Sequence, residues 1–123
     1  MQSGEHLLIV EEEFLIALDI QRVLESVKPR RIVFARNFEE VAQLGDRVEA
    51  FDLAVITAPR NGTTDYDVAR RLVAAGVALV VCSAMPKPLV DDPIEGAEIV
   101  GKPFADADLL AACSQALQRY NPA

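Results

Sequence analysis

The sequence predicts an α/β fold in which a parallel sheet is covered by helices on both faces. Short apolar runs alternate along the chain with amphipathic stretches, which is the pattern of strands that alternate with helices. The runs at residues 51–56 and 77–82 are almost continuously apolar, as expected for strands buried on both faces of a sheet. Polar residues directly follow four of the apolar runs, and this indicates where a functional site would lie.

Five strands and four helices are predicted in this alternation. The strands are expected at residues 7–10, 31–35, 51–56, 77–82 and 99–100. The helices are expected at residues 14–26, 37–44, 66–75 and 106–119. Asn37 is a suitable N-cap with Glu40 three residues later, and Gly76 suits the C-terminal end of the third helix.

The connection between the fourth and fifth predicted strands departs from this alternation. It carries Pro86, Pro88 and Pro93. Proline removes a backbone donor and clashes with the preceding turn, so we expect at most one helical turn, near residues 89–92. The helix of this connection is therefore predicted to be short or missing.

Apolar side chains within the elements predict the composition of the core. The aromatic residues spaced as core residues are Phe14, Phe34, Phe38 and Phe51. The first helix is expected to turn inward an apolar face of Leu15, Leu18, Ile20, Val23, Leu24 and Val27. Cys82 and Cys113 stand in apolar contexts, which predicts reduced thiols within the core.

Size and charge limit the class of protein. The chain has 123 residues, of which 51% are hydrophobic and 25% charged, so residues 1–123 are expected to form one soluble domain. Nineteen acidic residues against twelve basic ones give a net charge of -7, which disfavours binding to nucleic acid or to an anionic membrane. Neither a membrane span nor a signal peptide is present in the sequence, so a cytoplasmic protein is expected.

Five polar residues lie at the predicted carboxyl ends of strands. They are Glu11, Glu12, Thr57, Ser83 and Lys102. Ligands of open parallel sheets bind at this end, so we expect these side chains to form one site. Acids, a hydroxyl and a lysine suit a phosphate and a metal ion, but the central strand ends in Thr57, where a carboxylate would be needed to take the phosphate.

The order of these residues resembles that of a receiver domain of two-component response regulators, the module of which chemotaxis response regulators consist. Residues 7–13 are similar to the family's first strand and acidic pair, and residues 52–57 to its third strand and phosphoacceptor. Residues 81–84 are similar to the fourth-strand hydroxyl, and residues 96–97 and 102–104 to the closing signature. The resemblance covers essentially the whole chain and implies a flavodoxin-like (βα)5 three-layer sandwich with strand order 2-1-3-4-5.

The resemblance also implies a role for each residue of the site. Glu11 and Glu12 match the acidic pair that holds Mg²⁺ with hard oxygen ligands, and Thr57 matches the aspartate that attacks phosphorus. Ser83 matches the hydroxyl that moves onto the phosphate, and Lys102 matches the lysine that neutralises the phosphoryl oxygens.

Departures from the family pattern predict that this phosphorylation switch is lost. Thr57 has no carboxylate, and its hydroxyl is a poor metal ligand. Glu11 and Glu12 are one methylene longer than aspartates, which displaces an ion that demands near-ideal octahedral geometry. Ile99 stands at the position of the switch aromatic. We therefore expect a degenerate phosphorylation site that needs no cofactor and in which any Mg²⁺ binding is weakened.

Lys102 is expected to pair with Glu11 or Glu12 in place of the metal, because unbalanced carboxylates at a buried rim would repel one another. The glutamates could instead be a solvated charge run at the start of a helix. Ser83 and Lys102 also have the composition of a Ser-Lys nucleophilic pair, but no oxyanion-hole signature accompanies them, so no enzyme is expected.

These expectations predict an atypical, stand-alone receiver that binds a protein without aspartyl phosphorylation. The last predicted helix ends near the final residue, so no appended output domain is expected, and output would pass through a histidine kinase, another regulator or a homodimer. Two alternatives stay open. One is a Mg²⁺-dependent receiver that accepts the phosphoryl group on Glu11 or Glu12, and the other is a small-anion sensor formed by Thr57, Ser83 and Lys102.

Overall fold

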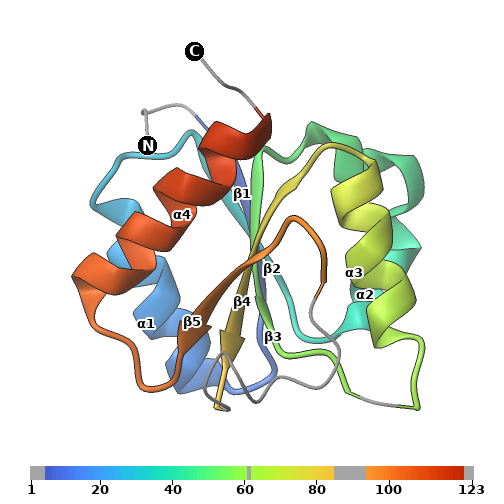
Figure 1. Cartoon of the computed structure of the whole chain (residues 1–123), viewed down its shortest axis with the longest axis horizontal. Coiled ribbons are helices and arrows are strands. Elements are labelled where there is room, and N and C mark those ends of the chain that lie inside the picture. Colours follow the sequence, from blue (N-terminus) through green and yellow to red (C-terminus); the bar gives the residue numbers. More distant parts are fainter. Residues whose placement is uncertain (1–4, 61, 85–93, 121–123) are drawn as a thin grey trace.

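Five parallel strands form one sheet, in the order β2-β1-β3-β4-β5 (Figure 1). The computed structural model of the protein describes residues 5–60, 62–84 and 94–120. The strands are β1 (His6–Val10), β2 (Arg31–Ala35), β3 (Leu53–Thr57), β4 (Ala78–Ser83) and β5 (Glu98–Gly101). The predicted strand order is confirmed.

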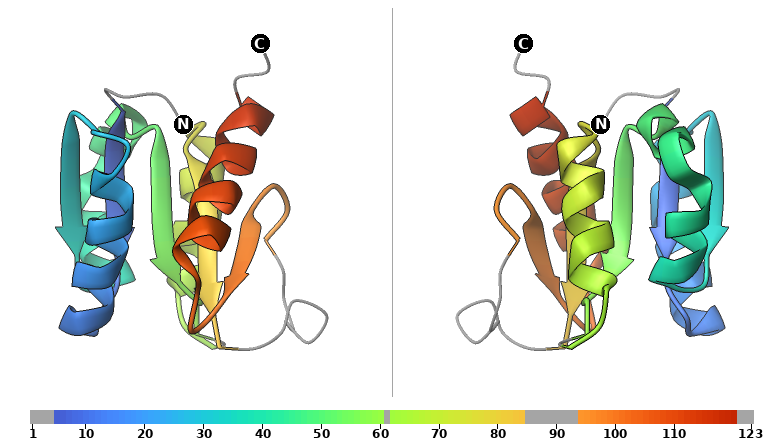
Figure 2. Two further views of the ribbon diagram at one scale, coloured as in Figure 1. Left: turned by 90° about the vertical axis from the view of Figure 1, so that its left-hand side faces the viewer. Right: turned by 90° about the vertical axis from the view of Figure 1, so that its right-hand side faces the viewer.

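The helices lie in two layers, one on each face of the sheet. Helices α1 (Phe14–Glu25) and α4 (Asp106–Tyr120) cover one face, and α2 (Phe38–Leu44) and α3 (Asp65–Ala74) cover the other. The two side views of Figure 2 show the first pair and then the second pair in front of the sheet. A short 3-10 helix, η1 (Gly45–Ala50), leads into β3 and was not predicted. The layers form the predicted flavodoxin-like sandwich.

Each face of the sheet has its own apolar core. Successive residues of a strand point to opposite faces, so β1 contributes Leu7 and Ile9 to the core under α1 and α4. It contributes Leu8 and Val10 to the core under α2 and α3. The strands β1, β3 and β4 are therefore apolar along nearly their whole length, as the sequence predicted.

Helix α2 begins at its predicted cap. The side chain of Asn37 accepts a hydrogen bond from the backbone nitrogen of Glu40 at 2.9 Å. The carboxylate of Glu40 reaches back to the backbone nitrogen of Arg36 at 2.6 Å, which lowers the pKa of Glu40. Gly76 follows α3 with a φ of 86°, in agreement with its predicted place at the end of that helix.

The prediction that Phe14, Leu15, Leu18 and Phe34 belong to the core is wrong. Their exposed fractions are 73%, 78%, 41% and 45%. The buried residues of α1 are Ala17, Ile20, Val23 and Leu24. A helix turns by about 100° per residue, so Leu18 lies about 160° around the axis from Ile20 and faces solvent. Phe34 lies in β2, which is an edge strand with a neighbour on one side only.

The connection from β4 to β5 contains the three prolines. Its residues 85–93 lie outside the described ranges, and so does the predicted single helical turn. Within the described ranges, no helix has the length and apolar character needed to cross a membrane.

Candidate functional site

The strand register gathers predicted site residues at one edge of the sheet. The pairing of β1 with β3 places Glu11 beside Thr57, since each follows directly on the last paired residues of the two strands. Ser83 ends β4 and is paired with the last residue of β5. Lys102 comes next, and its backbone nitrogen donates to the carbonyl oxygen of Ser83 at 2.8 Å.

Lys102 joins the other polar side chains at this edge. Its Nζ donates to Glu11 Oε1 at 2.9 Å and to Thr57 Oγ1 at 3.3 Å. The side chain of Glu11 is only 3% exposed and that of Lys102 is 22% exposed, so the ion pair is largely withdrawn from water. The structure contains the ion pair that the sequence predicted, with Glu11 as the partner. We term Glu11, Thr57 and Lys102 the strand-end site.

The second carboxylate oxygen of Glu11 is held at the start of α1. Glu11 Oε2 accepts a hydrogen bond from the backbone nitrogen of Glu13 at 3.1 Å. Glu13 directly precedes the first residue of α1, so the carboxylate lies at the positive end of the helix dipole. Both oxygens of Glu11 therefore have partners within the protein.

Glu12 is not brought into this cluster. Its side chain is exposed, whereas that of Glu11 is buried. Ser83 is buried at the end of β4, with 4% exposure. Ile99 lies within β5, pairs with Val81 and packs against the core under α2 and α3. The choice between Glu11 and Glu12 was the part of the site that the sequence left open.

The side chains at this edge fit Mg²⁺ poorly. The ion takes hard oxygen ligands in near-ideal octahedral geometry. Glu11 is already bound to an ammonium group, Glu12 faces solvent, and Thr57 offers only a hydroxyl. Over the described ranges, no group of three or more His, Cys, Asp or Glu residues could hold a metal ion. The hydrogen bonds of Lys102 balance the charge of Glu11 and connect the ends of the strands. No chemical step through a metal follows from this arrangement.

Cys82 lies in β4 and is paired with Thr57. The pKa of its thiol therefore depends on how far water reaches this edge of the sheet. Burial raises the pKa of its thiol to about 12, an effect that Lys102 opposes and Glu11 reinforces. Burial likewise raises the pKa of Cys113 to about 12. A thiol with so high a pKa is protonated at neutral pH and is a poor nucleophile. Both cysteines are free and buried, as predicted.

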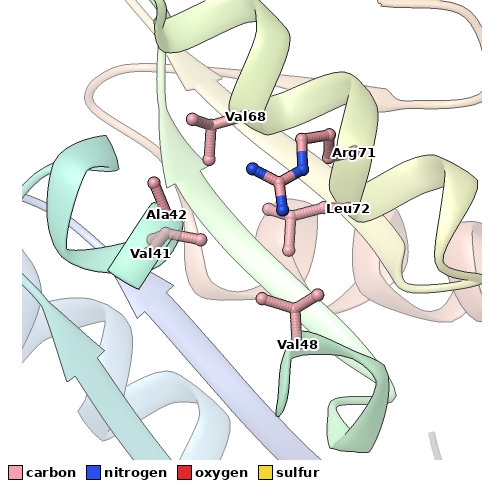
Figure 3. A pocket seen from close by; sticks show the side chains of 6 residues that line it. All are labelled: Val41, Ala42, Val48, Val68, Arg71 and Leu72. Carbon is pink, nitrogen blue, oxygen red and sulfur yellow. The ribbon is translucent and has the colours of Figure 1, made fainter. Parts of the chain in front are cut away.

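Among the described residues, a small cavity and an open groove lie away from the strand-end site. A cavity of about 10 Å³, room for about one water molecule, lies between α2, η1 and α3, and Figure 3 shows the guanidinium of Arg71 among its apolar side chains. Its lining consists of Val41, Ala42, Val48, Val68, Arg71 and Leu72. An open groove of about 390 Å³ runs between β5 and α4. Neither lining includes a residue of the strand-end site.

Solved structures share this fold. The response regulator PhyR from Brucella abortus matches with a TM-score of 0.79 and 26% identity, over 98% of this chain and 51% of its own. A variant of the anti-anti-sigma factor PhyR from Bartonella quintana has a TM-score of 0.78 and 24% identity, over 100% and 52%. A response regulator receiver protein from Sinorhizobium medicae has a TM-score of 0.76 and 20% identity, over 96% and 98%. The chain has the receiver fold.

The receiver fold is thus established by similarity of structure, at sequence identities of 20–26% for the three proteins named. Neither the protein-family models nor the curated proteins give a match to the sequence. The chain spans about half the length of the two PhyR proteins and almost all of the Sinorhizobium medicae receiver. The likeness to these solved structures shows the fold of the chain.

Proposed function

We propose that this receiver signals by binding a protein and not by accepting a phosphoryl group. The observation that carries the proposal is the position of the Lys102 ammonium, 2.9 Å from Glu11 and 3.3 Å from Thr57. In a phosphorylated receiver this positive charge would neutralise the phosphoryl oxygens. Here a buried carboxylate of the protein already neutralises it.

The chemistry of Thr57 supports the proposal. Attack on phosphorus needs a nucleophile that is deprotonated or that has a base to take its proton. Lys102 donates a hydrogen bond to Thr57 Oγ1, so the ammonium cannot act as that base. Thr57, at the predicted acceptor position, is held as a hydrogen-bonding partner of the ion pair and is not activated for attack.

The proposal also assigns the output to a partner. Ile99 offers no aromatic ring that could rotate between a buried and an exposed position, and it packs against the core under α2 and α3. A receiver without this switch acts through the protein that it holds, such as a histidine kinase or another regulator. The ion pair between Lys102 and Glu11 would keep the strand ends in one arrangement for that contact, without Mg²⁺.

Incubation with acetyl phosphate and Mg²⁺, followed by intact-mass measurement, tests the proposal. We expect no phosphoryl adduct on the wild-type chain. A stoichiometric adduct that hydroxylamine removes would overturn it, because such an adduct forms on a carboxylate. If it appeared, the variants Glu11→Gln and Glu12→Gln would identify the acceptor by its loss. Stabilisation of the chain by millimolar inorganic phosphate would instead indicate an anion sensor.

A further inference from the structure

The outer side of β2 has backbone groups that no strand pairs with. β2 is the last strand on one side of the sheet, and in both views of Figure 2 it is the outermost strand. The carbonyl oxygen of Ala35 accepts a hydrogen bond from the backbone nitrogen of Glu11, so the backbone groups of Ala35 face β1. Alternate residues of a strand direct these groups to opposite sides. Ile32 and Phe34 therefore direct their N–H and C=O groups away from β1.

This side of β2 lacks the usual protection of an edge strand. Charged side chains, prolines and bulges commonly keep a strand edge from pairing with another chain. The pairing of β2 with β1 has no bulge, and the residues from Ile32 to Ala35 are all apolar. The open side ends at Arg36, whose backbone nitrogen donates to the carboxylate of Glu40 at 2.6 Å. We term residues 32–34 the β2 edge.

Apolar side chains flank the β2 edge on both faces of the sheet. Phe34 is 45% exposed and pairs with Ile9, so it points to the face that α1 covers. Ile32 lies on the same face and is partly buried. Val33 points to the opposite face and is also partly buried, against the core under α2 and α3. A strand added beside β2 would cover apolar surface on both faces, which is favourable.

Positive charge is concentrated at the start of β2. The side chains of Lys28, Arg30 and Arg31 are exposed, and none of them forms a hydrogen bond or an ion pair with another described residue. In contrast, Arg22 and Arg36 are bound to carboxylates of the chain. The net charge of the chain is -7, so this basic segment differs in sign from the protein as a whole. A partner that passes it is expected to be acidic.

We infer that the β2 edge binds an extended segment of another protein, which adds a strand to the sheet. This inference rests on the proposed function of the chain as a protein-binding receiver. The backbone of the segment would pair with the N–H and C=O groups of Ile32 and Phe34. The segment would be apolar beside the β2 edge and acidic where it passes Arg30 and Arg31.

A second copy of the chain fits the β2 edge less well. Two-fold pairing of β2 with itself, centred on Val33, places Arg30 of one copy opposite Arg36 of the other, and like charges at such positions are destabilising. The net charge of -7 adds to the repulsion. Pairing of β2 with β5 of another copy leaves one edge open at each end, so it produces filaments and no closed assembly. A separate acidic segment has neither consequence.

Hydrogen exchange of the full chain in the presence of a synthetic peptide tests the inference. The peptide has about five alternating valines and threonines, which favour strands, between glutamates at both ends. A second peptide carries lysines in place of the glutamates. We expect the glutamate peptide to slow exchange at the amides of Ile32 and Phe34 by about tenfold, because they gain hydrogen bonds. The amides of Val33 and Ala35 should change less, since they already face β1, and the lysine peptide should protect none of the four.

Methylation of the peptide backbone separates strand addition from attraction between charges. Methyl groups on every backbone nitrogen of the central stretch remove its hydrogen-bond donors and leave the glutamates in place. The methylated glutamate peptide should therefore lose the protection of Ile32 and Phe34. This comparison uses the wild-type chain and does not depend on the folding of any variant.

Variants make the test specific to the β2 edge. Phe34→Pro removes an N–H that faces away from β1, a position at which an edge strand tolerates proline. It should weaken the glutamate peptide by about tenfold relative to Phe34→Ala, which loses the ring and keeps the N–H. Arg30→Glu with Arg31→Glu should also weaken it, with a smaller effect as salt is raised. The matched control is Arg47→Glu with Arg70→Glu, an exposed pair with the same change in net charge, which should bind like the wild type.

Three outcomes would overturn the inference. They are the absence of protection at Ile32 and Phe34 with millimolar glutamate peptide, equal protection by the methylated and unmethylated peptides, and filaments of the chain alone that Phe34→Pro disperses in sedimentation experiments. The exchange experiment uses no phosphoryl donor, so its result is separate from that of the acetyl phosphate experiment. A chain that neither accepts phosphate nor binds the glutamate peptide would refute the inference about the β2 edge and leave the proposed function standing.

Discussion

Phe14, Leu15, Leu18 and Phe34 are large apolar side chains exposed to water, and we term them the α1 patch. The strand-end site and the α1 patch begin three residues apart in the sequence, at Glu11 and Phe14, yet their environments are opposite. In the strand-end site, the carboxylate of Glu11 is buried and bound to Lys102 and to the start of α1. In the α1 patch, large apolar side chains remain in contact with water. The polar residues that match a phosphorylation site have their partners within the protein, whereas the α1 patch keeps apolar surface in water.

This contrast gives a physical reason why the chain can have the receiver fold without the phosphorylation chemistry of other receivers. A lysine that already has a buried carboxylate partner must lose that partner before it can receive an anion, and breaking a buried pair is costly. Apolar surface in water has no such partner to lose, and covering it is favourable.

Removal of Lys102 is expected to have the largest effect on stability. In Lys102→Ala, the carboxylate of Glu11 stays buried without a counter-charge, so the free energy of unfolding should fall by about 3 kcal/mol in urea denaturation at neutral pH. The control is Arg36→Ala, which breaks an exposed ion pair with Glu40 and should cost less than about 1 kcal/mol. Equal losses of the free energy of unfolding in the two variants would show that the ion pair of the strand-end site is not shielded from water.

Thr57→Asp is expected to weaken the ion pair of the strand-end site and to allow Mg²⁺ to bind there. The new carboxylate competes for Lys102 and repels Glu11, so the free energy of unfolding should fall by about 1–2 kcal/mol without metal. Millimolar Mg²⁺ should recover this loss, because two carboxylates then share a divalent ion. Thr57→Asn has the same size without the charge and should show neither effect in urea denaturation. Equal stabilisation of the wild type by Mg²⁺ would contradict the account.

The pKa of the Cys82 thiol depends on how well the strand-end site is shielded from water. Its pKa is raised from the ordinary 9.0 to about 12, so the unfolded chain loses the thiol proton at a lower pH than the folded chain does. This contribution to stability is complete below pH 9 and is lost between pH 9 and 12. Cys82→Ala should remove about 1 kcal/mol of the decline between pH 9 and 10, measured by urea denaturation.

The corresponding control is Cys113→Ala, which removes the other buried thiol. It should leave in place the part of the decline in stability that Cys82 causes. If the native thiol of Cys82 were instead to titrate near pH 9, water would have access to the floor of the strand-end site, and the contrast with the α1 patch would weaken.

Phe14→Ser is expected to have the smallest effect. An exposed side chain contributes little to folding, so the free energy of unfolding should change by less than about 0.5 kcal/mol in thermal or urea denaturation. Ile20→Ala, on the buried side of the same helix, should cost about 2–5 kcal/mol. A loss at Phe14 close to that at Ile20 would mean that the patch is part of the core after all.

Much of the fold could be predicted because the central strands are buried on both faces. The segments that became β3 and β4 contain too few polar residues to be helices on a surface, and parallel strands must end at a common edge. That common edge is why Glu11, Thr57 and Lys102, far apart in the sequence, could be expected to meet. The pairing of Lys102 followed from the need to balance a buried carboxylate.

Other features depended on tertiary context. The direction in which the chain leaves β1 decides that Glu11 is buried and Glu12 exposed, and no local pattern determines it. The first turns of α1 are apolar on nearly every side, so the sequence offered two faces that could have met the sheet. Leu15 and Leu18 were assigned to the wrong one, and the same error hid the α1 patch.

The central claim is that the strand-end site is closed to a phosphoryl group, and amide spectra recorded with Mg²⁺ and beryllofluoride, a stable phosphoryl mimic, test it most directly. We predict that the amides of Thr57, Ser83 and Lys102 stay in place in the wild-type chain and move in Thr57→Asp. A new set of wild-type peaks for these three residues would contradict the account.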